Sequence, residues 1–329
     1  MRNVAIFFLC ITFLQSCRDD FSLEAPYENI PVVYAYLDAS ENEHFIRVQK
    51  AFLGQNGNGE LSATVIDSLY YGENEAEVTI TQNGEEVSLE RVNGDDFGIS
   101  RPEGDFANTP NILYRLPRTL LDLRPELTAT IAVKRPGEED AVAQTLLLGP
   151  MSIAQPSTTI NIFNYNQNQN WRWDVTPGTR VFDARLYINI REFFLSDPSM
   201  NRDVQLEWIL SEQLIPDEDE TRVVLTFNNE RFWQFLNSNL AVNDDVRRSL
   251  DDMVLVVTGV GSEIEEELEL AAANAGITSA QALPTYTNVE NGLGVFTSRT
   301  QATLRDIVLD ARNNDTLRNG VYTRDLNFQ

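Results

Sequence analysis

The residue with the clearest chemistry is Cys17, which follows an apolar run ending in Leu14-Gln15-Ser16. Such a run after a basic Arg2 is typical of a secretory signal peptide, and it is too short to span a bilayer, which takes about 20 apolar residues. In bacterial lipoproteins this cysteine is acylated and becomes the first mature residue, and several acyl chains, at about 0.8 kcal/mol per buried methylene, make a durable anchor. We therefore predict a lipoprotein signal peptide over residues 1–16, with Leu14, Gln15 and Ser16 as the lipobox and Cys17 as the lipid attachment site. An ordinary secreted protein is the alternative.

The segment after Cys17 begins with Arg18-Asp19-Asp20. This short charged stretch resembles the signal that sorts lipoproteins of Bacteroidota to the outer face of the outer membrane, and the alternative is a plain solvated tether. We interpret residues 17–30, which contain Pro26, as that tether. The expected location is therefore the outer membrane, with the protein lipid-anchored and exposed at the cell surface.

Charge is the unusual feature of the composition, with 50 acidic against 25 basic residues and a net charge of −25. Such a surface repels nucleic acid and anionic headgroups, and it attracts basic partners and divalent cations. The apolar fraction of 42% is sufficient for ordinary cores. We therefore expect a folded protein with no nucleic-acid partner.

Catalytic and metal-binding patterns are sparse. Cys10 leaves with the signal peptide and Cys17 is acylated, so the folded part has no disulfide, thiolate nucleophile or cysteine metal ligand. The one histidine, His44, lies in a predicted strand, where a solvated side chain is expected, and no hydrolase, metalloprotease or phosphate-loop motif is present. Acidic turns at 93–96 and 216–220 could hold calcium loosely, but ordinary turns are the simpler interpretation. We predict no catalytic residue, no metal and no cofactor, and hence a protein that is not an enzyme.

One patch has the composition of a ligand site. Residues 161–173 interleave amides with aromatic side chains, including Tyr165, Trp171 and Trp173. Sugar-binding sites use aromatic faces for stacking and amides for hydroxyl groups. Because Trp171 and Trp173 share one face of a predicted strand, burial in a core is the favoured interpretation. The three aromatic residues are the candidate ligand site of an alternative, glycan-binding function.

Period-two alternation indicates the elements that position these residues. A buried strand over 31–37 and a returning strand over 44–52 form a first hairpin, and Asn83-Gly84 marks another. Frequent turns without a long helical pattern predict a β-sandwich over residues 31–150. The stretch from Gly149-Pro150 to Gln155-Pro156 is the predicted domain boundary.

The second domain, over residues 156–299, is predicted to be another sandwich with helical insertions. Helices are expected from Asn229, from Asn243 through Met253, and from the capping box that starts at Ser262. Residues 300–329 are interpreted as a C-terminal extension. The expected fold class is mainly β, with two immunoglobulin- or fibronectin-like β-sandwich domains, the second of which carries short helices.

The end of the second domain carries the most specific pattern, Asn291-Gly292-Leu293-Gly294-Val295-Phe296 after Pro284 and Asn288. This ending resembles that of the family called domain of unknown function 4249, which consists of lipoproteins of Bacteroidota. Departures from the family pattern at 67–71 and after Arg299 make a sister family the alternative. The resemblance implies a two-domain sandwich on the outer membrane, often beside TonB-dependent transporters, with no known reaction and no functional residue to carry over.

The same motif has a structural interpretation of its own. Glycines permit positive φ angles and close backbone approach, which suits a bent or bulged terminal strand, and the apolar side chains would enter a core. We therefore assign a structural role to Asn291, Gly292, Leu293, Gly294 and Phe296.

Together these patterns predict a non-enzymatic, lipid-anchored outer-membrane accessory of an envelope or TonB-dependent transport assembly. It is expected to act by binding a protein partner such as an outer-membrane β-barrel. A glycan- or nutrient-binding surface lipoprotein is the alternative.

Overall fold

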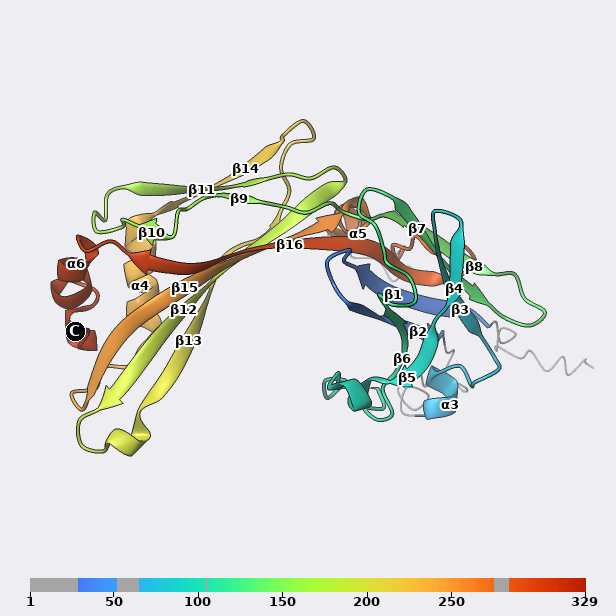
Figure 1. Ribbon diagram of the computed structural model, residues 1–329, viewed down its shortest axis with the longest axis horizontal. Coiled ribbons are helices and arrows are strands. Elements are labelled where there is room, and N and C mark those ends of the chain that lie inside the picture. Colours follow the sequence, from blue (N-terminus) through green and yellow to red (C-terminus); the bar gives the residue numbers. More distant parts are fainter. Residues whose placement is uncertain (1–28, 52–64, 105, 275–283) are drawn as a thin grey trace, which may run out of the picture.

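The computed structural model describes residues 29–51, 65–104, 106–274 and 284–329. The predicted lipobox, the attachment site Cys17 and the tripeptide Arg18-Asp19-Asp20 lie outside the described residues. The fold is mainly β, as the alternation predicts, and the described strands form three sheets. Figure 1 shows an arch of two lobes that are joined by the long strand β16 (Leu293–Leu309).

The largest sheet has nine strands and runs through both lobes. Its order is β13-β12-β15-β16-β1-β2-β6-β5, and β10 pairs with β16 beside this path. Its other strands are β1 Pro31–Leu37, β2 Glu43–Lys50, β5 Glu90–Asn93, β6 Ile112–Pro117, β10 Thr159–Ile160, β12 Thr179–Phe194, β13 Arg202–Leu214 and β15 Val246–Gly261.

Two smaller sheets accompany it. The four-stranded sheet, in the order β4-β3-β7-β8, belongs to the N-terminal lobe, and the three-stranded sheet, in the order β14-β11-β9, belongs to the C-terminal lobe. Their strands are β3 Glu77–Gln82, β4 Glu85–Ser88, β7 Thr128–Lys134, β8 Ala141–Leu146, β9 Ile153–Gln155, β11 Asn168–Asp174 and β14 Arg222–Asn228.

Short helices lie in the connections. Asn228 caps the predicted helix α4, one residue earlier than expected, because its side chain accepts a hydrogen bond of 2.9 Å from the Glu230 amide. In the described part of the chain, no helix has the length and apolar character needed to cross a membrane. The helices are α3 Ile66–Leu69, α4 Asn229–Asn239, α5 Ser262–Asn274 and α6 Asn313–Asn319, with 3₁₀ turns η3 Gly94–Phe97, η4 Pro198–Met200 and η5 Arg324–Leu326.

Strand β16 makes one sheet of the two lobes. Its first part pairs in parallel with β1 up to Ser298, and its second part pairs antiparallel with β15 from Arg299 to Ile307. The predicted domain end at residue 299 therefore falls inside a continuous strand. Residues 300–329, predicted as an extension, are instead part of the C-terminal lobe, whose core includes Ala302, Ile307, Leu317, Leu326 and Phe328.

The N-terminal lobe buries one core between two sheets. Val33 of β1 and Ile46 of β2 pack with Ile80 of β3 and Ile131 of β7. The four-stranded sheet thus covers one face of the β1-β2-β6 part of the large sheet, since strands expose alternate residues to opposite faces.

The C-terminal lobe buries a second core on the same face of the large sheet. Ile188 of β12 packs with Trp173 of β11 and with Trp233 of α4. Phe296 belongs to the first core and Ala302 to the second, and an even separation along a strand puts both side chains on one face. The two covering layers therefore lie on the same side of the nine-stranded sheet.

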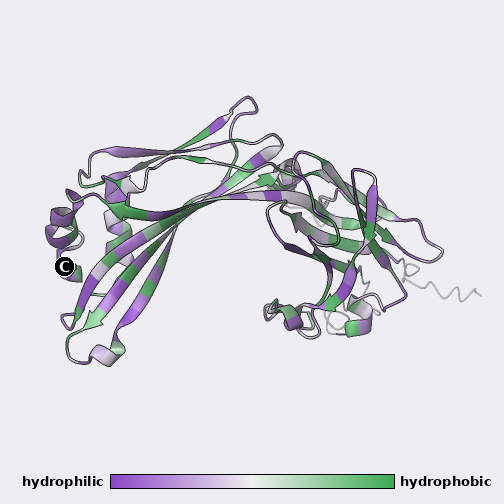
Figure 2. Cartoon of the chain, viewed as in Figure 1, coloured by the Kyte–Doolittle hydropathy of each residue, from purple (hydrophilic) through white to green (hydrophobic). Residues whose placement is uncertain are grey.

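The predicted helix from Asn243 is wrong, because Val246–Gly261 form strand β15. Val246 and Leu250 have helical spacing, but β15 pairs with β12 along its whole length, and these long-range hydrogen bonds override the local pattern. Figure 2 shows apolar and polar residues alternating along the long strands of this lobe.

The predicted hairpin turn is confirmed. Asn83 and Gly84 join β3 to β4 with φ angles of 53° and 81°. Positive φ at both central residues is the geometry of the two-residue turn whose twist matches that of the flanking strands.

Candidate functional site

The tryptophans of the predicted ligand patch lie in the core of the C-terminal lobe. Trp171 is 1% exposed and Trp173 is 0% exposed. Trp171 packs edge-on against Phe227, with ring centroids 5.0 Å apart, and Trp173 lies 6.1 Å from Phe182. The burial agrees with the packing interpretation, and neither indole presents a face to a ligand.

Tyr165, the third residue of that patch, is only partly buried. Its ring packs edge-on against Trp233 at 6.5 Å and against Tyr322 at 5.6 Å. The structure therefore does not bring the three aromatic residues together as a stacking platform, and Tyr165 belongs to the packing between α4 and the C-terminal segment.

The closing motif has the structural role that we assigned to it, with one correction. Asn288 brackets Phe296, since its Nδ2 donates to the Phe296 carbonyl at 2.7 Å and its Oδ1 accepts from the Phe296 amide at 2.9 Å. Asn291 has a positive φ of 54° and donates to the Asp140 carbonyl at 3.2 Å. Phe296 is buried, but Leu293, predicted to enter a core, is 39% exposed.

His44 is buried and not solvated as expected. It is 7% exposed, and its Nε2 lies 2.8 Å from the Asp38 carbonyl oxygen. The acidic turn at 93–96 is held by its own side chains, because Asn93 Oδ1 accepts from the amides of Asp95 and Asn111. In the described part of the chain, no three His, Cys, Asp or Glu side chains gather in a group that could hold a metal ion.

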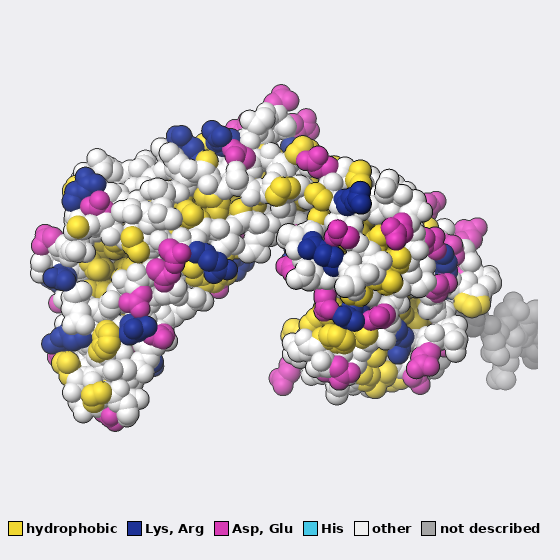
Figure 3. Space-filling model, viewed as in Figure 1, with side chains coloured by type: hydrophobic (Ala, Val, Ile, Leu, Met, Phe, Trp, Pro, Cys, Tyr) yellow, Lys and Arg dark blue, Asp and Glu magenta, His cyan; other side chains and the backbone are white. Residues whose placement is uncertain are grey.

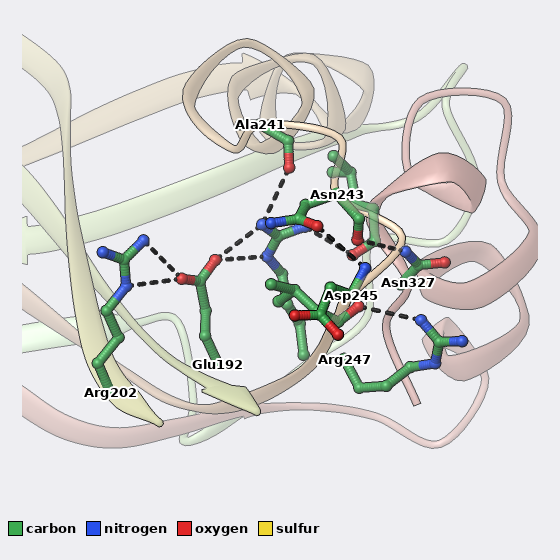
Figure 4. A network of polar contacts seen from close by, with 10 residues as sticks. Glu192, Arg202, Ala241, Asn243, Asp245, Arg247 and Asn327 are labelled. Carbon is green, nitrogen blue, oxygen red and sulfur yellow. Dashed lines mark hydrogen bonds and ion pairs between the residues drawn. The ribbon is translucent and has the colours of Figure 1, made fainter. Parts of the chain in front are cut away.

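A buried ion pair ties the C-terminal segment to the large sheet (Figure 4). Arg248 of β15 donates from Nε to Glu192 Oε1 at 2.8 Å, from Nη1 to the Leu326 carbonyl at 2.8 Å and from Nη2 to the Ala241 carbonyl at 2.9 Å. Arg202 donates from Nε to the other oxygen of Glu192, also at 2.8 Å. Burial alone would raise the pKa of Glu192, but these two guanidinium groups outweigh it and hold the pKa below its ordinary value.

A pocket of about 240 Å³ opens beside this pair, with Phe194, Val204 and Leu240 among its lining residues. Because Glu192 is ionised between two arginines, it is no proton donor near neutral pH. We interpret the arrangement as a structural clamp on the C-terminus. No sequence pattern indicates it, since Glu192 and Arg248 lie 56 positions apart.

The other side of the nine-stranded sheet carries exposed side chains, and we call it the open face. Figure 1 places the three-stranded sheet above β16, and Figure 3 shows the molecule hollowed below it between the lobes. Since both cores lie on the covered side, neither of the two smaller sheets covers the open face. The open face consists of Tyr34 and Tyr36 of β1, Arg47 of β2, Arg185 and Tyr187 of β12, Val254 and Val256 of β15, and Gln301 and Thr303 of β16.

Tyr34 and Tyr36 are the aromatic centre of the open face. Each is 48% exposed, although the sequence predicts a strand buried on both sides. The alternation of tyrosines with Val33, Ala35 and Leu37 is the signal that could have found them. Because the two tyrosines are spaced by two residues on one strand, both half-exposed rings lie on the same face of the sheet.

Helix α5 places carboxylates beside these tyrosines. The helix packs against β12, β15 and β16, and Glu263 accepts a hydrogen bond of 2.9 Å from Thr297 Oγ1 on β16. Burial and the carboxylate of Glu267 raise the pKa of the Tyr36 hydroxyl, which therefore stays protonated. The open face thus combines aromatic surface with negative charge.

The C-terminal half of the open face is polar and internally paired. Arg185 donates to Glu207 at 2.5 Å, and Arg191 donates to Asp203 at 2.9 Å. Such exposed pairs neutralise one another and leave little free charge. The unpaired negative charge and the exposed aromatic side chains therefore lie near β1 and α5.

No protein-family model matches this chain, and no curated protein matches it. Among solved structures, the chain is similar to the calcium-binding domain CBD12 of CALX1.1, at 8% identity over 82% of this chain and 98% of that chain, with a TM-score of 0.18. A similarity at this level carries no argument about fold or function.

Proposed function

We propose that this protein is a non-enzymatic, lipid-anchored accessory of an outer-membrane assembly and that it binds a basic surface of a protein partner through Tyr34, Tyr36 and the acidic helix α5. We also propose that each lobe is a β-sandwich of the immunoglobulin or fibronectin kind, as the resemblance to the domain of unknown function 4249 family implies. The observation that carries the proposal is the pair of half-exposed tyrosines beside Glu267.

Aromatic side chains of this kind dominate binding energy at protein interfaces. Tyrosine supplies a large, rigid contact area and a hydroxyl that can be satisfied at the rim. Its negatively polarised ring face also attracts lysine and arginine side chains, by about 0.5–2 kcal/mol per contact. Tyr34 and Tyr36 therefore suit a partner that presents cationic side chains.

The charge of the chain favours the same kind of partner. Helix α5 has acidic residues at 263, 265, 266, 267 and 269. Glu265 is occupied by a bidentate pair with Arg180, whose Nε and Nη2 donate at 2.6 and 2.7 Å. Glu266 accepts from the Tyr286 hydroxyl at 2.9 Å. Glu267 and Glu269 form no ion pair within the described chain and contribute an unbalanced negative field that steers basic surfaces toward the tyrosines.

The predicted anchor keeps this surface near the membrane. The described fold begins at Asn29, whose side chain accepts a hydrogen bond of 2.9 Å from Tyr71. The twelve residues from 17 to 28 span at most about 40 Å when extended. A protein lipidated at Cys17 would therefore hold its open face within reach of membrane-embedded partners, such as an outer-membrane β-barrel.

The glycan-binding alternative depended on exposed aromatic rings at Tyr165, Trp171 and Trp173. Its candidate platform needs exposed ring faces, and Trp171 and Trp173 are buried. We therefore do not carry this function further.

A site-specific photocrosslinker tests the proposal in cells. We expect p-benzoylphenylalanine at Tyr36 to form an adduct with one outer-membrane protein, and the same group at Phe163, which is 41% exposed outside the open face, to form none. Glu267→Lys with Glu269→Lys should remove the adduct, because the charge that attracts the partner is reversed. Equal adducts from both positions, or an adduct that survives the charge reversal, would contradict the proposed surface.

A further inference from the structure

Among the residues that the structure describes, two arginines of the N-terminal lobe lie close to each other without a carboxylate partner. Arg47 is on the open face of β2, and Arg101 is in the loop that follows η3. Two other arginines of this lobe have counter-charges, since Arg115 pairs with Glu43 and Glu90, and Arg118 pairs with Asp122. Arg91 and Arg135 donate to backbone carbonyls instead. The chain has twice as many acidic as basic residues, yet these two guanidinium groups lie beside each other and not beside a described carboxylate.

Arg101 is positioned by neutral groups. Its Nη1 donates to the Tyr70 hydroxyl at 3.1 Å, and its guanidinium lies 4.4 Å from the centroid of the Phe106 ring. Tyr70 is buried. The hydroxyl accepts this hydrogen bond and keeps its own proton available for a further acceptor.

Arg47 of β2 is the second arginine of the group formed with Arg101 and Tyr70. Nη1 of Arg47 is buried without a hydrogen-bond partner in the described part of the chain. The charged and titratable groups that act on Arg47 are Arg101 and Tyr70, and burial together with the positive charge of Arg101 lowers the pKa of Arg47. A buried donor without an acceptor and two like charges side by side both cost stability, and an anion between them would recover it.

We infer that Arg47, Arg101 and the Tyr70 hydroxyl form a binding site for an oxyanion of the phosphate class. A guanidinium group presents paired N–H donors that match two oxygens of a phosphate, and two such groups from different elements suit a tetrahedral ligand. A phosphate monoester carries a charge of about −1.5 to −2 at pH 7, which balances two arginines, whereas a single carboxylate would leave one unpaired. Either free phosphate or the phosphate of a lipid headgroup has this chemistry.

The net negative charge of the protein does not forbid such a site. Exposed charges are screened beyond about 8 Å at physiological ionic strength, so the local pair of arginines decides the affinity at short range. The site borders the proposed partner surface, since Arg47 of β2 lies directly across from Tyr34 of β1, but its assignment depends on different observations from that proposal.

Thermal unfolding with inorganic phosphate tests the inference. At constant ionic strength, we expect phosphate to raise the melting temperature of the wild-type protein saturably, because a ligand that binds only the folded state stabilises it. Arg101→Gln and Tyr70→Phe should reduce or abolish the rise, and Arg47→Gln should do the same. Arg124→Gln is the matched control, since Arg124 is an exposed arginine of the same lobe, and it should keep the full rise.

The measured quantity is the change in melting temperature between samples with and without phosphate. A lower melting temperature of the Arg47 variant without phosphate therefore does not affect the comparison. Co-sedimentation with phosphatidic acid vesicles, compared with phosphatidylcholine vesicles, separates the two sources of phosphate. Arg101-dependent binding to the former without a response to free phosphate would assign a headgroup. A shift that is equal in the wild type and in Arg101→Gln, or no response of the wild type to either probe, would overturn the site.

Discussion

Gly294 and Val33 approach so closely that a Cβ atom at residue 294 would stand 2.0 Å from the carbonyl oxygen of Val33. The contact lies where β16 pairs in parallel with β1, the junction that joins the two lobes in one sheet. Gly294 also has a φ angle of +104°, which residues with a side chain rarely adopt. Sterics and backbone conformation therefore both select glycine at this position of the closing motif.

We predict that Gly294→Ala destabilises the protein by more than about 2 kcal/mol, because the added methyl group must displace the backbone of β1. Urea unfolding followed by circular dichroism measures the loss. Gly84→Ala is the control, since Gly84 has a similar φ of +81° but no atom within 4 Å of the added Cβ. This control should lose only about 1 kcal/mol, and equal losses would contradict the close contact as the main cause.

The clamp at Glu192 predicts a pH-dependent stability. We expect Glu192→Gln to lose about 3 kcal/mol at pH 7, because the change leaves a buried guanidinium without its counter-charge. The folded pKa of Glu192 is lowered, so its contribution is fully present above the unfolded value of about 4.3 and disappears as pH falls through the folded pKa. The difference between wild type and variant should therefore shrink toward pH 3.

Asp203→Asn is the matched control for the clamp, since Asp203 pairs with Arg191 at 2.9 Å on the surface. Exposed pairs contribute little, and we expect no measurable change in the urea midpoint. A loss in Glu192→Gln that is the same at pH 7 and pH 3 would show that the side-chain ionisation is not responsible.

Replacement of the buried tryptophans by alanine should destabilise the C-terminal lobe. Trp173→Ala and Trp171→Ala should each cost about 3–5 kcal/mol, because each leaves a large cavity in a closed core. Val224→Ala, at a half-exposed position on the adjacent β14, should leave the melting temperature almost unchanged. Well-folded tryptophan variants with wild-type stability would contradict this packing and restore the glycan-binding interpretation.

Period-two alternation predicted most strands because each long strand has one face in a core, as Leu186, Ile188 and Ile190 of β12 show. It could not predict which sheet a strand joins. The continuity of β16 through both lobes depends on pairings with β1 and β15 that are distant in sequence, and this is why residues 300–329 were misassigned. Long-range pairing with β12 also explains why the segment after Asn243, where a helix is expected, forms strand β15.

The candidate site was harder to predict than the fold. The sequence pointed to aromatic residues next to amides, but Trp171 and Trp173 are closed in by β12 and α4. The sequence does not single out Tyr34 and Tyr36, because an apolar run does not indicate which face of its strand is covered. The covered face is determined by the sheet that packs against the strand. The guanidinium pair of Arg47 and Arg101 comes from different elements and leaves no motif.

The proposed lipid anchor at Cys17 gives a further prediction. We expect Cys17→Ala to lack acyl chains and to leave the washed membrane fraction, because the thiol of Cys17 is the proposed attachment site and the apolar run that ends at residue 14 is too short to span a bilayer. Fractionation after high-salt and carbonate washing, with mass spectrometry of the N-terminal peptide, measures both effects. Asp19→Ala with Asp20→Ala is the control, since it should keep lipidation while lowering protease accessibility on whole cells if the tripeptide sorts the protein. A Cys17→Ala protein that stays in the washed membrane pellet would show that something other than this thiol anchors the chain.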